Sequence, residues 1–124
     1  MNILRSHKEL DVYKLAFRLS MDIYNLSKSF PKEEQYGLTS QIRNSSRSVA
    51  ANLAEAFRKR RYEKAFVAKL SDSEGESAET QTWLDFSYNC GYISQETCNQ
   101  LNSEYEHVIA MIVNMIKSPA KWSF

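Results

Sequence analysis

The sequence contains few of the residues that interrupt helices. Proline occurs twice and glycine three times among 124 residues, and no proline stands between Pro31 and Pro119. Long uninterrupted helices are therefore compatible with most of the chain. No apolar run approaches the roughly 20 residues that a membrane-spanning helix needs, and the first residues lack the apolar core of a signal peptide. We expect a single domain without a membrane span or a secretion signal.

Cysteine and histidine are also scarce, with two of each. Cys90 and Cys98 form no CxxC motif, and neither has a histidine nearby to complete a metal site. Their spacing across a glycine turn favours two separate thiols of a cytosolic protein, with a disulfide as the alternative. We therefore expect a cytoplasmic protein that holds no metal ion and no other cofactor.

Lysine and arginine are absent from a long part of the chain. Residues 1–70 contain fourteen Lys and Arg against seven Asp and Glu, whereas the segment from Ser71 to Ile116 contains eight acidic residues and no basic one. The formal net charge of +1 conceals this segregation. Two interpretations stay open. In the first, a basic face of the protein binds a polyanion. In the second, basic and acidic helices pair with each other within one chain or between subunits.

Apolar residues, by contrast, recur at helical spacing along the whole chain. In the first segment they stand alternately four and three residues apart, as in the seam of a helix bundle; these are Val12, Ala16, Leu19, Ile23, Leu26 and Phe30. Similar spacing predicts further helices over about 36–61, 62–90 and 94–116. Short connections make neighbouring helices antiparallel. The sequence therefore predicts an all-α fold, an antiparallel up-and-down four-helix bundle, with residues 1–124 as one domain.

The third predicted helix has an unusual seam. Its middle positions are occupied by small hydroxylated residues, Ser73, Ser77 and Thr80, instead of large apolar ones. Small side chains let another helix approach closely. We therefore expect this helix to have a close neighbour.

Some apolar side chains stand beside the seams instead of within them. The first helix adds Tyr13, Phe17 and Tyr24, and the fourth adds Ile109 and Ile116. Aromatic rings can flank a core with their phenol groups in water, or they can form a subunit interface. We favour an oligomer.

Two short segments lie outside the predicted bundle, an N-terminal extension over 1–9 and a C-terminal tail over 117–124. Pro119 ends the fourth helix and leaves Trp122 and Phe124 without a helix to hold them. Short tails are commonly disordered. The sharper hypothesis is that Trp122 docks on a neighbouring subunit or a partner.

The second predicted helix, Tyr36–Arg61, carries the candidate functional residues. If it continues to its last residue, Arg43, Arg47, Arg58 and Arg61 share a face that is separate from the apolar stripe. Guanidinium groups suit phosphate oxygens, so the candidate nucleic-acid-binding residues are Arg43, Arg47, Arg58, Lys59, Arg60, Arg61 and Lys64. No RNP-like motif or zinc finger accompanies them, and we expect binding by charge and shape with little sequence preference. The alternative is that these arginines pair with acids of the third helix.

Catalytic candidates are few. Glu104 and His107 have the Glu-x-x-His spacing of di-iron bundles, but such a site needs two of these pairs, and His7 precedes the first helix. No glycine-rich phosphate loop or nucleophile elbow occurs, and neither cysteine has a base on the same helical face. We therefore predict a protein that is not an enzyme and has no catalytic residues.

Four stretches also resemble a known family. The order of YGLTSQIR, NLAEAF, ETQTWL and GYIS is similar to that in the four-helix-bundle family of 23S rRNA intervening-sequence proteins; the stretches are Tyr36–Arg43, Asn52–Phe57, Glu79–Leu84 and Gly91–Ser94. The likeness extends from about Leu10 to Ile116. This chain has Val49-Ala50 and Ala56 where the family typically has Ile-Pro and Gly. We therefore expect a straighter second helix that continues toward Arg58.

The resemblance implies a bundle that assembles into a ring of five, a homopentamer, in a family whose molecular role is poorly defined. A related group with the same fold, the accessory variability proteins of diversity-generating retroelements, binds nucleic acid through a basic surface and partners a reverse transcriptase. Two function hypotheses follow. One is an oligomer that binds RNA or DNA, and the other is an oligomeric scaffold whose faces meet each other or a protein partner.

Overall fold

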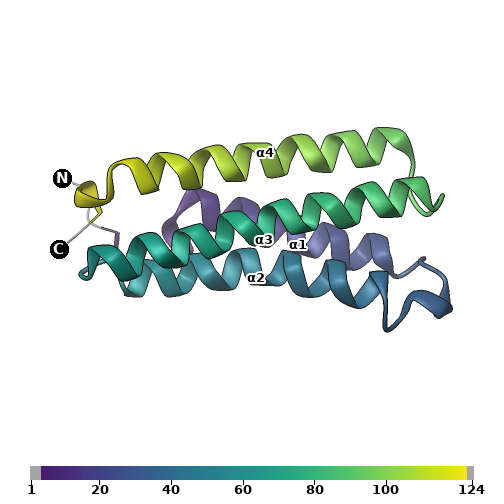
Figure 1. The fold of residues 1–124 in the computed structure, drawn as a ribbon, viewed down its shortest axis with the longest axis horizontal. Coiled ribbons are helices and arrows are strands. Elements are labelled where there is room, and N and C mark those ends of the chain that lie inside the picture. Colours follow the sequence, from purple (N-terminus) through teal and green to yellow (C-terminus); the bar gives the residue numbers. More distant parts are fainter. Residues whose placement is uncertain (1–3, 123–124) are drawn as a thin grey trace.

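Antiparallel helices make up the structure, a computed structural model that describes residues 4–122 (Figure 1). Within this range the long helices are α1 (Asp11–Ser27), α2 (Leu38–Arg58), α3 (Glu63–Asn89) and α4 (Gln95–Lys117). Short 3₁₀ turns stand before α1, between α1 and α2, and after α4; they are η1 (His7–Glu9), η2 (Lys32–Glu34) and η3 (Pro119–Lys121). The helices run up and down in chain order, so the predicted four-helix bundle is confirmed.

The apolar stripe of each helix faces a common core. On α1 the predicted seam is buried except for Leu26, which is half-buried, and Phe30 is buried in the turn after the helix. On α2, five apolar residues at helical spacing are all buried: Leu38, Ile42, Val49, Leu53 and Phe57. Removal of apolar surface from water, at about 25 cal/mol per Å², is the main favourable term that holds the helices together.

Hydroxyl groups line the interface between α2 and α3. The Ser73 hydroxyl donates to the Val49 carbonyl at 2.8 Å, and the Thr80 hydroxyl donates to Ser45 Oγ at 2.8 Å. All three hydroxyl-bearing side chains are buried. A buried hydroxyl without a partner costs free energy. These hydrogen bonds offset that cost for the small hydroxylated residues in the seam of α3. They also confirm the close neighbour that the sequence predicted for this helix.

The end of α2 differs in part from the prediction. The helix continues to Arg58, as the loss of the family glycine suggested, but it does not include Arg61. The backbone amide of Tyr62 donates to the Lys59 carbonyl at 2.8 Å and closes a turn, and α3 begins at the next residue. The expectation that Arg61 shares a helical face with Arg43 is therefore wrong, because the chain has already turned.

A glycine ends α3. Gly91 has φ of +82°, a conformation that L side chains rarely adopt. Its N–H donates to the Tyr88 carbonyl, and the next N–H, from Tyr92, donates to the Ser87 carbonyl, both at 2.9 Å. These bonds satisfy carbonyls at the end of α3. Ser94 then caps α4, since its hydroxyl accepts from the Thr97 amide at 3.1 Å.

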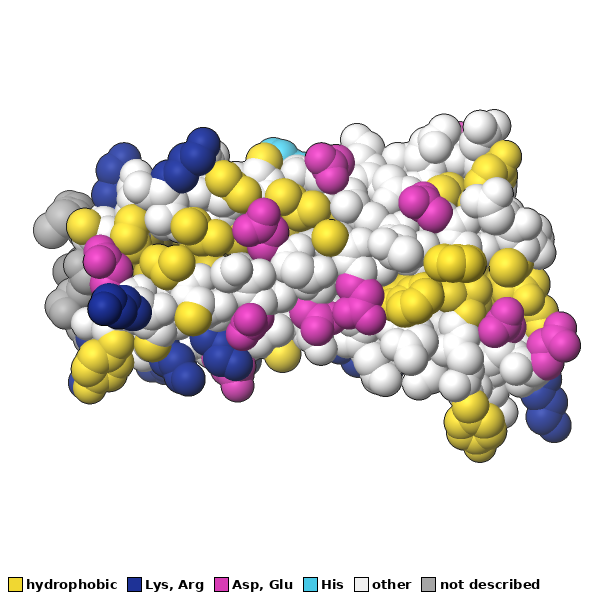
Figure 2. Space-filling model, in the orientation of Figure 1, with side chains coloured by type: hydrophobic (Ala, Val, Ile, Leu, Met, Phe, Trp, Pro, Cys, Tyr) yellow, Lys and Arg dark blue, Asp and Glu magenta, His cyan; other side chains and the backbone are white. Residues whose placement is uncertain are grey.

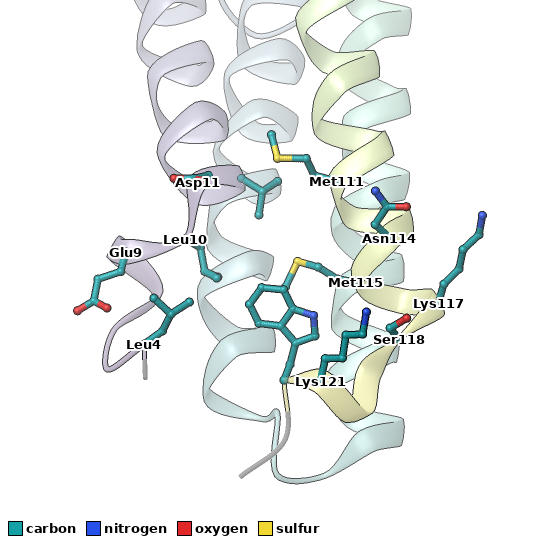
Figure 3. A pocket seen from close by; sticks show the side chains of 12 residues that line it. Leu4, Glu9, Leu10, Asp11, Met111, Asn114, Met115, Lys117, Ser118 and Lys121 are labelled. Carbon is teal, nitrogen blue, oxygen red and sulfur yellow. The ribbon is translucent and has the colours of Figure 1, made fainter. Parts of the chain in front are cut away.

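The described part of the tail folds back on its own chain. Trp122 follows η3 and lines a hollow of about 660 Å³ between the start of α1 and the end of α4. In Figure 3, Leu10 and Met115 point into this hollow, whereas Lys117 points away from it. Trp122 is half-buried against the core. Contact with its own bundle therefore replaces the predicted disorder at Trp122. Docking of Trp122 on a neighbouring subunit or a partner stays a prediction, and Phe124 lies outside the described residues.

The surface over α3 and α4 shows the charge segregation directly. In Figure 2, Asp and Glu side chains are spread along the whole length of this face, while most of the Lys and Arg side chains gather toward its left end. Hydrophobic side chains are exposed between the acids in two areas of the same face. None of the helices over residues 4–122 combines the length and the apolar content that a membrane crossing needs.

Candidate nucleic-acid interface

Three cations from two helices surround one aromatic ring. Tyr24 lies on α1, and Lys28 follows it one helical turn later. The Lys28 ammonium stands 4.9 Å from the centroid of the Tyr24 ring, the Arg43 guanidinium 4.8 Å and the Arg47 guanidinium 5.8 Å. We call Tyr24, Lys28, Arg43 and Arg47 the Tyr24 cluster. A cation over the face of a ring is attracted by the π electrons. The Tyr24 ring therefore offsets part of the repulsion among the three cations.

Hydrogen bonds hold Arg43 within this cluster. Its Nε donates to Ser27 Oγ at 2.8 Å, and one terminal nitrogen donates to the Tyr24 carbonyl at 3.5 Å. Both acceptors are neutral, so the positive charge of Arg43 is positioned without being neutralised. Arg47, one turn further along α2, is exposed. Lys28 is exposed as well, so the cluster has one fixed cation and two that are accessible to a ligand.

A second basic group lies at the turn between α2 and α3, about 16 Å along the α2 axis from Arg47. Arg58, Lys59, Arg61 and Lys64 are exposed there. The Arg61 guanidinium stands 6.0 Å from the Tyr62 ring centroid, and Tyr62 is itself exposed. We call the four cations Arg58, Lys59, Arg61 and Lys64 the basic turn. The candidate residues thus form two groups instead of the single face that the helical projection predicted.

Arg60 differs from its neighbours because it contacts the protein. Its guanidinium lies 3.6 Å from the Phe57 ring centroid and donates to the Phe57 carbonyl at 3.0 Å and to the Leu4 carbonyl at 3.4 Å. Burial, together with the charges of Arg58 and Arg61, lowers the pKa of Arg60. These contacts tie the end of α2 to the N-terminal extension. Arg60 therefore has a structural role, and its part in nucleic-acid binding stays a prediction.

Ion pairs between helices use other cations. Among the described residues, Arg18 on α1 pairs with Glu104 on α4, and Lys69 on α3 pairs with Glu55 on α2 at 2.9 Å. Within the same range, no carboxylate lies within 4.0 Å of the following cations: Lys28, Arg43, Arg47, Arg58, Lys59 and Lys64. Opposite charges do meet inside the chain, but within the described range these ion pairs do not include the six cations named above.

The model of the 23S rRNA-intervening sequence protein family matches residues 8–114. The chain belongs to this family. The match includes α1, α2 and α3 and most of α4, and it confirms the resemblance inferred from the four short stretches.

A crystal structure supports the fold of this rRNA-intervening sequence protein family member. It is that of a protein with unknown function from the S23 ribosomal protein family of Bacteroides thetaiotaomicron, with a TM-score of 0.77 and 23% sequence identity. The similarity covers 86% of this chain and 95% of the other. At this level of identity the likeness concerns the fold. No curated protein matches the chain.

The structure does not bring together the remaining residues of this family member that could bind a metal ion or react. Glu104, which has metal-site spacing to His107, accepts a hydrogen bond from Arg18, and His107 is exposed. Cys90 is exposed and Cys98 is buried, and both thiols are free, as predicted. Over the described residues, no group of three or more His, Cys, Asp or Glu side chains could hold a metal ion. Burial raises the pKa of the Cys98 thiol, as does the nearby Asp85 carboxylate.

Sequence reasoning missed two members of the Tyr24 cluster. Lys28 was not among the candidates, and Tyr24 was considered for a core or a subunit interface. Their spacing of four residues on α1 was a visible signal, because residues at that spacing share a helical face. What the sequence did not reveal is that Arg43 and Arg47 of α2 pack against the same ring. That arrangement depends on how the two helices face each other.

Proposed function

We propose that this chain is a non-enzymatic nucleic-acid-binding protein that acts as an oligomer in the cytoplasm. The observation that carries the proposal is a set of exposed or positioned cations for which no carboxylate lies within 4.0 Å among the described residues; these are Lys28, Arg43 and Arg47 of the Tyr24 cluster and Arg58, Lys59 and Lys64 of the basic turn. Backbone phosphates of RNA or DNA would supply the missing negative charge. The free thiols of Cys90 and Cys98 suit a reducing compartment.

The proposed oligomer is the ring of five that the family resemblance implies. A ring repeats each cation around its axis, so the field at the nucleic acid would exceed that of a single chain. The acid-rich α3 and α4 would then be available for a protein partner. An RNA-handling or reverse-transcribing enzyme is the partner class that we propose, with this protein as its accessory factor.

The test is binding to labelled RNA and DNA oligonucleotides across a salt series. We expect the logarithm of the affinity to fall linearly with the logarithm of the salt concentration. Arg47→Gln should weaken binding to a single strand and reduce the slope by about 0.7, the value expected for loss of one phosphate contact. Arg58→Gln should act similarly through the basic turn. Affinity that does not change with salt would contradict the proposal.

Arg18→Gln is the matched control. It removes the same charge from an exposed arginine, but Arg18 is already paired with Asp22 and Glu104. We expect it to leave binding and the salt slope unchanged. If Arg18→Gln weakened binding as much as Arg47→Gln does, the effect would reflect net charge alone and the assigned surface would be wrong.

The alternative function is an oligomeric scaffold that does not bind nucleic acid. An aromatic patch favours this alternative, and it lies on the acid-rich half of the bundle, the part of α3 and α4 from Ser71 to Ile116. In this patch Phe86 is 53% exposed, and its ring lies 5.7 Å from that of Trp83. Such a patch suits a protein partner. If this alternative holds, Phe86→Ala should weaken self-association or partner binding in analytical ultracentrifugation. The arginine variants should likewise damage assembly, and no oligonucleotide should bind.

A further inference from the structure

An open groove continues from the Tyr24 cluster along the boundary of α1 and α2. It has a volume of about 310 Å³, and α1 lines one side with Tyr13, Phe17, Ser20, Met21 and Tyr24. The α2 side consists of Arg47 and small residues, Ala50, Ala51 and Ala54. From Tyr13 to Tyr24 the groove spans about 16 Å along α1, at about 1.5 Å per residue.

The walls of this groove are apolar and accessible. Phe17 is 52% exposed and Met21 is 44% exposed, although both could have been polar without any cost to the core. The rings of Tyr13 and Phe17 lie 6.1 Å apart with 38° between their planes, so together they form an aromatic wall. The alanines opposite leave the space between the helices open. The groove therefore offers flat apolar surfaces on one side and room on the other.

Arg47 links the groove to the cations. It lines the groove and also belongs to the Tyr24 cluster. One end of an apolar groove thus carries the charges of Lys28, Arg43 and Arg47, which have no carboxylate within 4.0 Å among the described residues. An occupant that suits this arrangement has flat, weakly polar rings and a negative charge beside them.

We infer that the groove takes the unpaired bases of a single-stranded nucleic acid, while the Tyr24 cluster takes the adjoining phosphates. The inference rests on the proposed function and adds to it the class of nucleic acid. In a duplex the bases are stacked inside and present their edges, whereas in a single strand their faces are free to stack on aromatic side chains. Stacking of this kind tolerates any base, which agrees with the absence of a sequence-reading motif.

The experiment compares two single strands with the same number of phosphates, one with bases and one abasic. We expect the wild-type protein to bind the strand with bases at least about 5-fold more tightly, the lower end of the effect of one stacked base. Phe17→Ala should remove this preference and leave the affinity for the abasic strand unchanged. Because Phe17 is half-exposed, the variant should fold, which circular dichroism would verify.

Phe86→Ala is the matched control, since Phe86 on α3 is as exposed as Phe17 but does not line this groove. We expect it to retain the preference for the strand with bases. A blunt duplex of the same length should bind without any difference between wild type and Phe17→Ala, because its bases cannot enter the groove.

The outcomes separate the inference from the proposed function. Equal, salt-dependent binding of both strands would overturn the inference and leave the proposed function standing. Failure of every oligonucleotide to bind would overturn both. If Phe17→Ala changed the mass of the assembly and left the preference for bases intact, the groove would be a contact between copies of this chain, and the inference would be wrong.

Discussion

The two halves of the bundle, α1 with α2 and α3 with α4, share one core but differ in the charge of their outer surfaces. Helices α1 and α2 direct their apolar stripes to the same core as α3 and α4. On the outside, α1 and α2 present the Tyr24 cluster, whereas the chain from Ser71 to Ile116 carries eight acids and no Lys or Arg. A repeating apolar pattern thus leaves the outer surface free to carry different charges. Folding constrains one side of each helix, and function can use the other.

The contacts that join the two halves show where the opposite charges are used for structure. Arg18 with Glu104 and Lys69 with Glu55 bridge the halves on the two sides of the bundle. Exposed pairs of this kind contribute little to stability. The hydroxyl bonds from Ser73 and Thr80 to α2 are buried and matter more. The cations of the Tyr24 cluster take no part in this joining, which distinguishes them from the structural charges.

The largest expected effect comes from a change in the core that both halves share. Leu84→Ala, at a fully buried position of α3, should lower the free energy of unfolding by about 2–5 kcal/mol, because it removes apolar contacts and leaves a cavity. Urea denaturation would measure this. Phe86→Ala, two residues away and half-exposed, is the control and should cost far less. Equal losses would mean that Phe86 is buried in the protein as it exists in solution.

A smaller effect is expected from the buried hydroxyls between the halves. Thr80→Val keeps the shape of the side chain but removes the hydrogen bonds to Ser45 Oγ and to the Glu76 carbonyl. We expect a loss of about 1–3 kcal/mol, since Ser45 stays buried without its donor. Thr82→Val removes a hydroxyl of the same helix that is exposed, and it should be nearly neutral. A neutral Thr80→Val would show that close helix packing does not depend on these bonds.

The exposed ion pair between the halves should contribute less, and its contribution should depend on pH. A hydrogen bond from Lys69 and the charge of its ammonium lower the pKa of Glu55. The pair therefore stabilises the fold above the usual pKa of Glu55, and the contribution is lost as the pH falls through the lowered value. Lys69→Met should lower the midpoint of thermal unfolding slightly at neutral pH and not in acid.

Lys64→Met provides the comparison for this pair, because Lys64 is exposed on the same helix and has no carboxylate within 4.0 Å among the described residues. It should leave the midpoint unchanged at both pH values. A loss on Lys69→Met that persists in acid would assign the effect to packing of the lysine stem instead of the ion pair.

The smallest effect should come from within the acid-rich half and should have the opposite sign. Burial, and then the charge of Glu79, raise the pKa of Glu76. A raised carboxyl pKa means that stability is lost as the pH rises from the usual value through the raised one. Glu76→Gln should therefore increase stability at neutral pH by about 0.2–0.5 kcal/mol, the size of a like-charge pair on a helix.

The gain from Glu76→Gln should vanish in acid, where wild-type Glu76 is already protonated; thermal unfolding at both pH values would measure it. Glu74→Gln on the same helix serves as the control for charge removal. An equal gain in both variants at neutral pH would point to the net charge of the acid-rich half instead of to Glu76.

Much of the fold could be predicted from the sequence because helical periodicity is a local property. The seam residues on α1 and α2, the cap at Ser94 and the break near Gly91 all follow from residue types at short spacing. The end of α2 was harder, since the same residues are compatible with a helix through Arg61. The turn closed by the Tyr62 amide ends the helix before Arg61. This turn also separates the candidate arginines into two groups.

The sequence by itself determined the family, the four helices and the segregation of charge along the chain. Tertiary structure decided which charges neutralise each other. Arg18 and Lys69 reach carboxylates on other helices, Arg60 reaches carbonyls, and Arg43 and Arg47 meet at Tyr24. The physical reason is that charge pairing depends on distances of a few ångströms between helices, and residue spacing along one helix contains no such information.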